Sequence, residues 1–250
     1  EKNFTDFLMT KGIEFEKEII KYLKKKYKCI KVADFYTLSD TKKTIKFMKQ
    51  GIPIIYSAPI YNPDNKTYGI IDLLVRSDYI NKIFNKNILS EREETLYSPL
   101  LDSKYHYRVI DIKYSTLNLA SDGKHIINSG RIPAYKSQVY IYNRAISNIQ
   151  GYDPNCAYIM GRRWNYSSKG VKYSGDNCMD TLGTVDFNTY DSKYITKTSK
   201  AIAWYRDVME NGINWTLYPP SKHELYPNMC IDSNKFNEMK NKVANNIGEI

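Results

Sequence analysis

The sequence predicts a single α/β domain, and its apolar patterning carries that prediction. Three short segments rich in β-branched and aromatic residues are typical of strands. Two longer segments place apolar residues at helical spacing, which is typical of helices packed on a core. The strands are expected at 52–60, 68–76 and 105–114, and the helices at 10–27 and 134–149.

Turn signals and weaker patterns complete the order of elements. The run Asn62-Pro63-Asp64-Asn65 is strong turn chemistry, so the strands on either side of it should form a hairpin. Residues 115–133 are expected to form a loop. The other expectations are a strand at 30–35, a helix from Asp40 or Thr41 to Gly51, a short helix in an irregular excursion at 79–104, a strand at 156–161, a loop or hairpin at 165–180, and helices at 189–211 and 233–246.

The chain is expected to form one domain, and two of its expected helices have a defined inward face. No internal repeat or linker is found, so the core should span about residues 10–163, with residues 189–250 as a C-terminal helical extension of one domain. The chain begins with Glu1 rather than Met, which leaves open that it is a fragment of a longer protein. The inward residues are Ile13, Glu16, Ile20, Leu23 and Tyr27 in the first helix, and Ile195, Ile202, Tyr205 and Met209 in the long C-terminal one.

The charge balance points to a polyanionic partner. The chain has 37 basic and 27 acidic residues, a formal net charge of +10 and a pI of about 9.2. Phosphates attract such a surface whatever the base sequence, so nucleic acid is the favoured partner. A lysine-rich surface that serves only solubility explains the same numbers, so composition alone does not decide between the two.

The cysteines and the hydropathy favour an intracellular protein. Cys29, Cys156, Cys178 and Cys230 are widely spaced and contain no CxxC pair, so we expect reduced thiols and no zinc site. No run approaches the roughly 20 apolar residues that span a bilayer, and no signal peptide opens the chain. We therefore expect a location in the cytoplasm or nucleus, neither secreted nor in a membrane.

Acidic side chains in two of the expected strands form the first candidate site. Asp72 lies in the apolar run at 69–75, and Asp111 and Lys113 project from one side of the third strand because alternate residues share a face. Buried carboxylates are costly unless they are neutralised, and a divalent cation neutralises them well. If the two strands are neighbours, Asp72 and Asp111 can converge on Mg²⁺ or Mn²⁺. Lys113 could then orient a water or stabilise developing negative charge.

Two helices add polar residues to this candidate site. Glu16 lies on the apolar stripe of the first helix, where a carboxylate is unusual. Gln138 and Tyr142 are four residues apart on the helix at 134–149 and hence adjacent on its surface. The alternative is structural: Asp111 and Lys113 form an ordinary ion pair, Asp72 caps a turn, and Tyr142 belongs to the core. The order of all these residues along the chain favours the catalytic interpretation.

These motifs together resemble the RecB-like branch of the PD-(D/E)XK nuclease superfamily over about residues 10–163. The resemblance rests on GIEFE at 12–16, GIID at 69–72, DIK at 111–113 and QVYIY at 138–142. It implies a restriction-endonuclease-like core with a central mixed sheet flanked by helices, and phosphodiester hydrolysis that depends on one or two Mg²⁺ or Mn²⁺ ions. It further implies that Glu16, Asp72, Asp111 and the carbonyl of Ile112 bind metal, that Lys113 is the catalytic lysine, and that Gln138 and Tyr142 organise the site or contact DNA.

The sequence departs from this family pattern in two places. Ile71 stands where the superfamily name has proline, which is common in this branch. The cysteines do not have the one-plus-three spacing of the relatives that hold an iron–sulfur cluster, so no cluster is expected. The chain contains no phosphate-binding GxxxxGK[ST] motif, so any helicase motor would belong to other domains of a longer chain or to a partner.

The function expected from the sequence is a DNA nuclease that serves repair or recombination, with exonuclease or endonuclease action undecided. An RNA-directed endonuclease and a non-catalytic nucleic-acid-binding module of the same fold are the alternatives. A metal-free interaction domain would leave Glu16 and Asp72 inward without a cation. Weaker candidates are His125 and Arg131 as phosphate contacts, the run Arg162-Arg163-Trp164 as a single-strand contact, and His106 on the sheet face away from Asp111.

Overall fold

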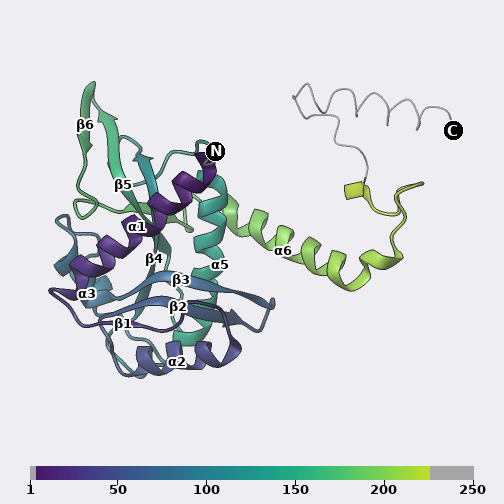
Figure 1. Ribbon diagram of the computed structural model, residues 1–250, viewed down its shortest axis with the longest axis horizontal. Coiled ribbons are helices and arrows are strands. Elements are labelled where there is room, and N and C mark those ends of the chain that lie inside the picture. The colour runs from purple at the N-terminus through teal and green to yellow at the C-terminus, as the bar shows by residue number, and fades with distance from the viewer. Residues whose placement is uncertain (1–3, 226–250) are drawn as a thin grey trace. The chain divides into compact units, whose positions relative to one another are not determined.

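The structure is a computed structural model that describes residues 4–225 of the chain (Figure 1). The helix expected at 233–246 and Cys230 lie outside the described residues. By its internal contacts the chain divides into two compact units, residues 1–202 and 203–250, and the boundary falls inside the helix α6.

Seven strands form one mixed sheet in the first unit, in the order β1-β2-β3-β4-β5-β6, and β7 also pairs with β5. β1 is parallel to β2 and β4 is parallel to β5, whereas all other neighbouring pairs are antiparallel. The α/β class and the mixed sheet flanked by helices are thereby confirmed. The strands are β1 (Cys29–Lys31), β2 (Ile54–Asn62), β3 (Thr67–Arg76), β4 (Tyr107–Asn118), β5 (Cys156–Ser168), β6 (Val171–Gly175) and β7 (Gly183–Asp186).

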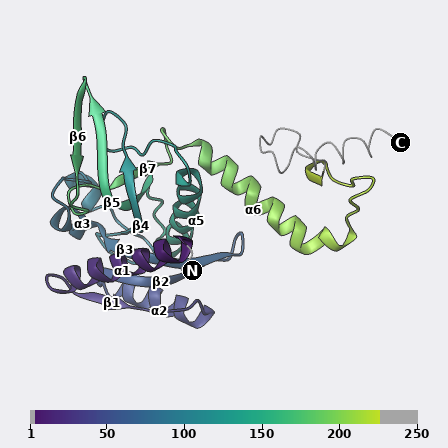
Figure 2. The ribbon, with the colours of Figure 1, turned by 45° about the horizontal axis from the view of Figure 1, so that its top comes forward.

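Helices cover both faces of the sheet, and each face has its own apolar core (Figures 1 and 2). On one face α1 packs through Ile19, Ile20 and Leu23 against Ile110 and its neighbours. On the other face α5 and α2 pack on the opposite side chains of the same strands. The helices are α1 (Phe4–Lys24), α2 (Leu38–Lys49), α3 (Ser77–Ile83), α4 (Glu91–Glu94), α5 (Ile132–Gln150) and α6 (Lys193–Asn211), with 3₁₀ turns at Gly212–Asn214 and His223–Leu225.

Several local signals act as the sequence predicts. β2 and β3 form the expected hairpin, and their register runs from Ile54↔Val75 to Asn62↔Thr67. The Thr37 hydroxyl accepts the N–H of Asp40 and caps the start of α2. Gly151 ends α5 in the left-handed conformation at φ 68°, which glycine adopts without a steric penalty.

The strands β4 and β5 are longer than their apolar patterns indicate. β4 continues to Asn118, into the segment expected to be a loop, and β5 continues to Ser168, where it forms a hairpin with β6. A bulge between Lys113 and Thr116 shifts the register against β5 and allows the pairing to continue. The position opposite the bulge must be a glycine, because a Cβ at Gly161 would lie 2.5 Å from the Leu117 side chain.

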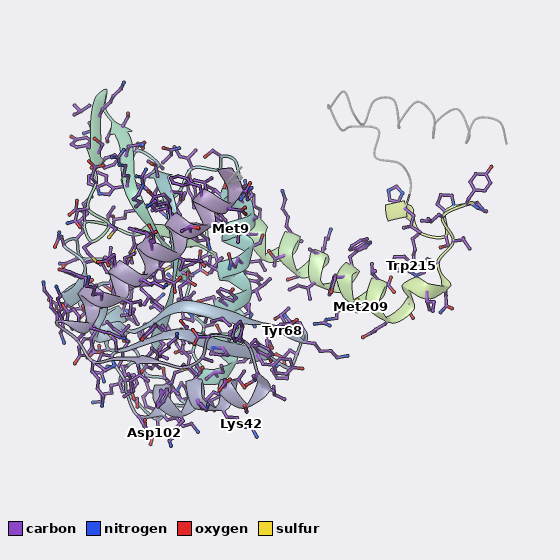
Figure 3. The ribbon with its side chains drawn as sticks, viewed as in Figure 1. Met9, Lys42, Tyr68, Asp102, Met209 and Trp215 are labelled. Atoms are coloured by element: carbon purple, nitrogen blue, oxygen red, sulfur yellow. The ribbon has the colours of Figure 1, made fainter. Side chains whose placement is uncertain are left out.

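Two of the predicted helix faces are wrong in part. α1 begins at Phe4 rather than near residue 10, and Ile13 is 53% exposed, although Ile20 and Leu23 are buried as expected. α6 begins at Lys193, and Ile195, Tyr205 and Met209, which the sequence predicts to face inward, are exposed. Met209 is labelled in Figure 3. Apolar residues at helical spacing predict a helix, but they do not ensure that another element covers the apolar face.

Candidate active site

The candidate site lies where β3 and β4 separate. Their antiparallel ladder runs from Arg76↔Tyr107 to Leu73↔Ile110 and then stops. One further step in this register would place Asp72 opposite Asp111 on one face of the sheet. Instead, the Asp72 carboxylate accepts the N–H of Ile112 in a hydrogen bond of 2.7 Å between Oδ2 and N. A side chain thus takes a place in the ladder, and two carboxylates meet at the fork between the strands.

The Asp111 carboxylate is buried and poorly satisfied. Its residue is 1% exposed, and neither Oδ1 nor Oδ2 receives a well-aligned hydrogen bond. Burial and then the neighbouring charge of Asp72 raise the pKa of Asp111 to about 7. Burial also raises the pKa of Asp72, against the opposing effect of the Ile112 N–H. The two carboxylates therefore compete for one low-dielectric space, which favours a shared proton or a cation between them.

Lys113 supplies an ammonium group at this fork. Its Nζ lies 2.7 Å from Asp111 Oδ2 and 4.9 Å from the centroid of the Tyr135 ring on α5. Burial acts to lower the pKa of Lys113, but the charges of Asp111 and Asp72 outweigh it and the pKa is raised. Asp111 and Lys113 share the α5 face of β4 with Val109, as the alternation of the strand predicts.

Glu16 reaches this site from α1 on the other face of the sheet. It is partly buried, and its pKa is raised first by burial and then by the charge of Asp72, while Lys113, Lys31 and Lys17 oppose the rise. The carboxylate therefore lies within electrostatic range of both Asp72 and Lys113. Its inward orientation agrees with the sequence analysis, and it adds a third acidic group at the edge of the fork.

Gln138 and Tyr142 line the fork from α5. Gln138 Nε2 donates a hydrogen bond of 3.0 Å to the Tyr142 hydroxyl, as their spacing predicts. Burial raises the pKa of Tyr142, and the charges of Asp111 and Asp72 raise it further, so the hydroxyl lies near both carboxylates. The ring packs directly on Gly69, where a Cβ would lie 2.5 Å from the Tyr142 Cε1. The glycine that precedes Asp72 by three residues thus makes room for the tyrosine.

The residues present fit a hard cation that needs only one or two ligands from the protein. Among residues 4–225, no three side chains of His, Cys, Asp or Glu gather closely enough to hold a metal ion together. Mg²⁺, however, is commonly bound through one or two carboxylates, with waters and substrate phosphates completing the octahedron. Asp111, whose buried oxygens receive no well-aligned hydrogen bond, and its neighbour Asp72 could supply those carboxylates. The Ile112 carbonyl as a ligand stays a prediction.

The weaker candidates from the sequence have partners elsewhere. His106 is buried and accepts a hydrogen bond from Arg108 Nε at 2.8 Å, and its ring lies against Tyr152 in a tilted arrangement. Burial lowers the pKa of His106 to about 3, so it is neutral. His125 stacks on Tyr190 and hydrogen-bonds Asp122. These contacts hold loops together, and they leave both histidines outside the fork.

The basic run Arg162-Arg163-Trp164 lies within β5 rather than after it, and its side chains have partners there. Arg163 Nε pairs with Asp176 at 2.6 Å, and the Arg162 guanidinium lies 4.7 Å from the centroid of the Tyr114 ring. Trp164 stacks near Tyr166, and both rings lie under the ammonium of Lys86. Arg131 is exposed at the start of α5.

Sequence reasoning missed two features that involve lysines: one buried ion pair and one surface hollow. A buried ion pair joins Lys136 on α5 to Asp191 just before α6, with 2.6 Å between Nζ and Oδ1. A hollow lined by lysines lies on α1 beside Glu16. The stripe Lys17, Lys21 and Lys24 on one side of α1 was a readable signal for the hollow, whereas nothing in the sequence links residues 136 and 191.

Comparison with known proteins adds no relative. No family model matches the sequence, and no curated protein matches it. No helix within residues 4–225 is both long enough and apolar enough to cross a bilayer.

Proposed function

We propose that the protein is a nuclease that hydrolyses phosphodiester bonds of DNA with Mg²⁺ or Mn²⁺. One observation carries the proposal: Asp72 and Asp111 meet at a strand fork beside Lys113, and neither oxygen of the buried Asp111 receives a well-aligned hydrogen bond, although the Lys113 ammonium lies 2.7 Å from Oδ2. Such an arrangement is unfavourable for folding by itself and suits a bound cation. The net charge of +10 suits a polyanionic substrate.

Each residue of the fork has a separate role in the proposed hydrolysis. Asp72 and Asp111 would hold the metal, and Asp72 is itself held in place by the Ile112 amide. A cation held there would supply a water of lowered pKa and would neutralise phosphate charge. Lys113 orients the attacking water or stabilises the charge that develops on the scissile phosphate. Glu16, at the edge of the fork, would be a further metal ligand, and Gln138 and Tyr142 shape the α5 side of the fork.

A cleavage assay tests the proposal. Linear and circular DNA, single- and double-stranded, is incubated with Mg²⁺ or Mn²⁺ and the wild-type protein, Asp111→Asn or Lys113→Gln. We expect wild-type cleavage and a loss of roughly 10³-fold in both variants, equivalent to about 4 kcal/mol of transition-state stabilisation. Nicked circles would identify an endonuclease, and nucleotides released from ends would identify an exonuclease.

Matched variants control for charge and folding. Asp6→Asn and Lys42→Gln make the same charge changes at exposed positions outside the fork, and both should cut at the wild-type rate. Cleavage that persists unchanged in Asp111→Asn and Lys113→Gln overturns the proposal. Cleavage of RNA but not DNA would support the RNA-directed alternative. Binding without cleavage in either metal would support a non-catalytic module.

A further inference from the structure

A hollow lined by lysines lies on α1 next to the candidate active site. Its volume is about 370 Å³, within the range of about 300–1,000 Å³ that is usual for ligand sites. Three of its lysines come from one stripe of α1, and the fourth comes from the end of β1. Its lining consists of Lys17, Ile20, Lys21, Lys24, Lys31 and Tyr56. We call this feature the lysine hollow.

The charge in the lysine hollow is only partly compensated. Lys21 pairs with exposed Glu18 at 3.3 Å, and Lys31 pairs with exposed Asp34, but such surface pairs are weak. Within residues 4–225, Lys17 and Lys24 form no ion pair with a carboxylate. Like-charged ammonium groups gathered around one hollow repel one another. An anion with several oxygens would relieve that repulsion.

The floor of the hollow is apolar. Ile20 and Tyr56 are buried, and the Lys24 ammonium lies 5.0 Å from the centroid of the Tyr56 ring. Cationic walls over an apolar floor match a nucleotide unit, whose phosphate can contact lysines while its sugar or base rests on carbon. A recess of this size also suits a strand better than a flat bilayer surface, which would contact a flat or convex basic face.

The hollow lies on α1 beside Glu16, which is within electrostatic range of the fork. Glu16, Ile20 and Lys24 follow one another at intervals of four residues, so they form one ridge of the helix. Lys31 and Lys17 both act electrostatically on Glu16, which in turn responds to Asp72. A polymer chain that passes Glu16 at the edge of the fork would therefore come next to the lysines.

We infer that the lysine hollow binds a backbone phosphate of the nucleic-acid strand on one side of the bond that is cut. This inference rests on the proposed function, because it takes the fork as the place of cleavage. It assigns Lys17 and Lys24 to substrate binding rather than to chemistry. Their loss should therefore weaken substrate binding and raise KM while leaving kcat near its wild-type value.

A binding titration tests the inference. The double variant Lys17→Gln/Lys24→Gln is compared with wild type for a labelled single-stranded oligonucleotide in EDTA, over a series of salt concentrations. Loss of two phosphate contacts should reduce the slope of log K against log[salt] by about 1.4, at about 0.7 per contact. Affinity at low salt should fall roughly tenfold, and KM in the cleavage assay should rise to a similar extent.

The matched control is Lys42→Gln/Lys46→Gln on α2, which packs on the opposite face of the sheet (Figure 3). It makes the same change in net charge and should keep the wild-type slope and KM. Equal thermal melting of all three proteins establishes that both variants are folded, and Lys21→Gln serves as a second test should the double variant melt early.

The outcomes separate this inference from the proposed function. If Lys17→Gln/Lys24→Gln matches its control in salt slope and in KM while wild type still cuts DNA, the inference alone is overturned. A wild type that cuts no nucleic acid overturns the proposed function, whatever the titration gives. Lysine variants that lose binding to phosphatidylserine vesicles but not to the oligonucleotide overturn the inference in favour of a membrane ligand.

Discussion

The lysine–aspartate pairs Lys136–Asp191 and Lys113–Asp111 differ in how completely their polar atoms are satisfied. In the pair Lys136–Asp191, both side chains are fully buried, and Lys136 also donates to the Ile126 carbonyl at 2.6 Å. Asp191 Oδ2 accepts the N–H of Asp186. In the pair Lys113–Asp111, the aspartate lacks a well-aligned donor and faces a second carboxylate. A satisfied ion pair indicates a structural role, whereas an unsatisfied one beside an extra carboxylate indicates a place for a ligand.

The largest expected effect in this comparison is on stability at the structural pair. Asp191→Asn leaves the ammonium of Lys136 buried without its counter-charge, and burial already acts to lower the pKa of Lys136. Removal of one partner of a buried pair costs about 3–5 kcal/mol, so the free energy of unfolding should fall by that amount. Urea denaturation measures it. Cleavage per folded molecule should stay near the wild-type rate, and a large loss of cleavage would contradict the structural assignment.

The same substitution at the fork should have the opposite effect on stability. The pKa of Asp111 is raised to about 7 from an ordinary value of 3.8, so between these pH values the folded protein binds more protons than the unfolded chain. Stability without metal should therefore fall as pH rises through this window. Asp111→Asn removes the penalty, and at pH 8 in EDTA it should stabilise the protein by about 1–3 kcal/mol. At pH 5 the gain should be much smaller, and an equal gain at both pH values would contradict this origin.

A smaller effect distinguishes the two pairs by their response to metal. Divalent ions that bind only the folded protein should raise its stability by about 1.4 kcal/mol at ten times their dissociation constant. The shift should occur in wild type and in Asp191→Asn, and should be lost in Asp111→Asn. Thermal melting with and without Mn²⁺ measures it. A shift that survives in Asp111→Asn would place the cation elsewhere.

Much of the fork could be predicted because its determinants are local. Alternation along a strand sets Asp111 and Lys113 on one face, and a helical turn joins Gln138 to Tyr142. The separation of β3 from β4 beyond Leu73↔Ile110 could not be predicted, because it depends on pairing between segments distant in sequence. The length of β4 was missed for a similar reason, since the bulge after Lys113 exists only against β5.

The exposed residues of α1 show a second limit of sequence reasoning. Ile13 lies on the same helical stripe as Ile20, yet it is exposed while Ile20 is buried. Periodicity gives the direction in which a side chain points, but the extent of the neighbouring sheet decides how far along the helix that direction is covered. Glu16 was nevertheless assigned correctly to the inward side, because it lies between the exposed and the covered parts of the stripe.

The bond between Asp72 and the Ile112 amide has a consequence for how freely this chain can change. One end of the bond belongs to the main chain, so any residue except proline at position 112 can supply it. The Ile112 side chain points into the apolar layer beneath α1, so only packing in that layer constrains its size and shape. Evolution can therefore rebuild that layer at position 112 while the alignment of Asp72 is inherited unchanged.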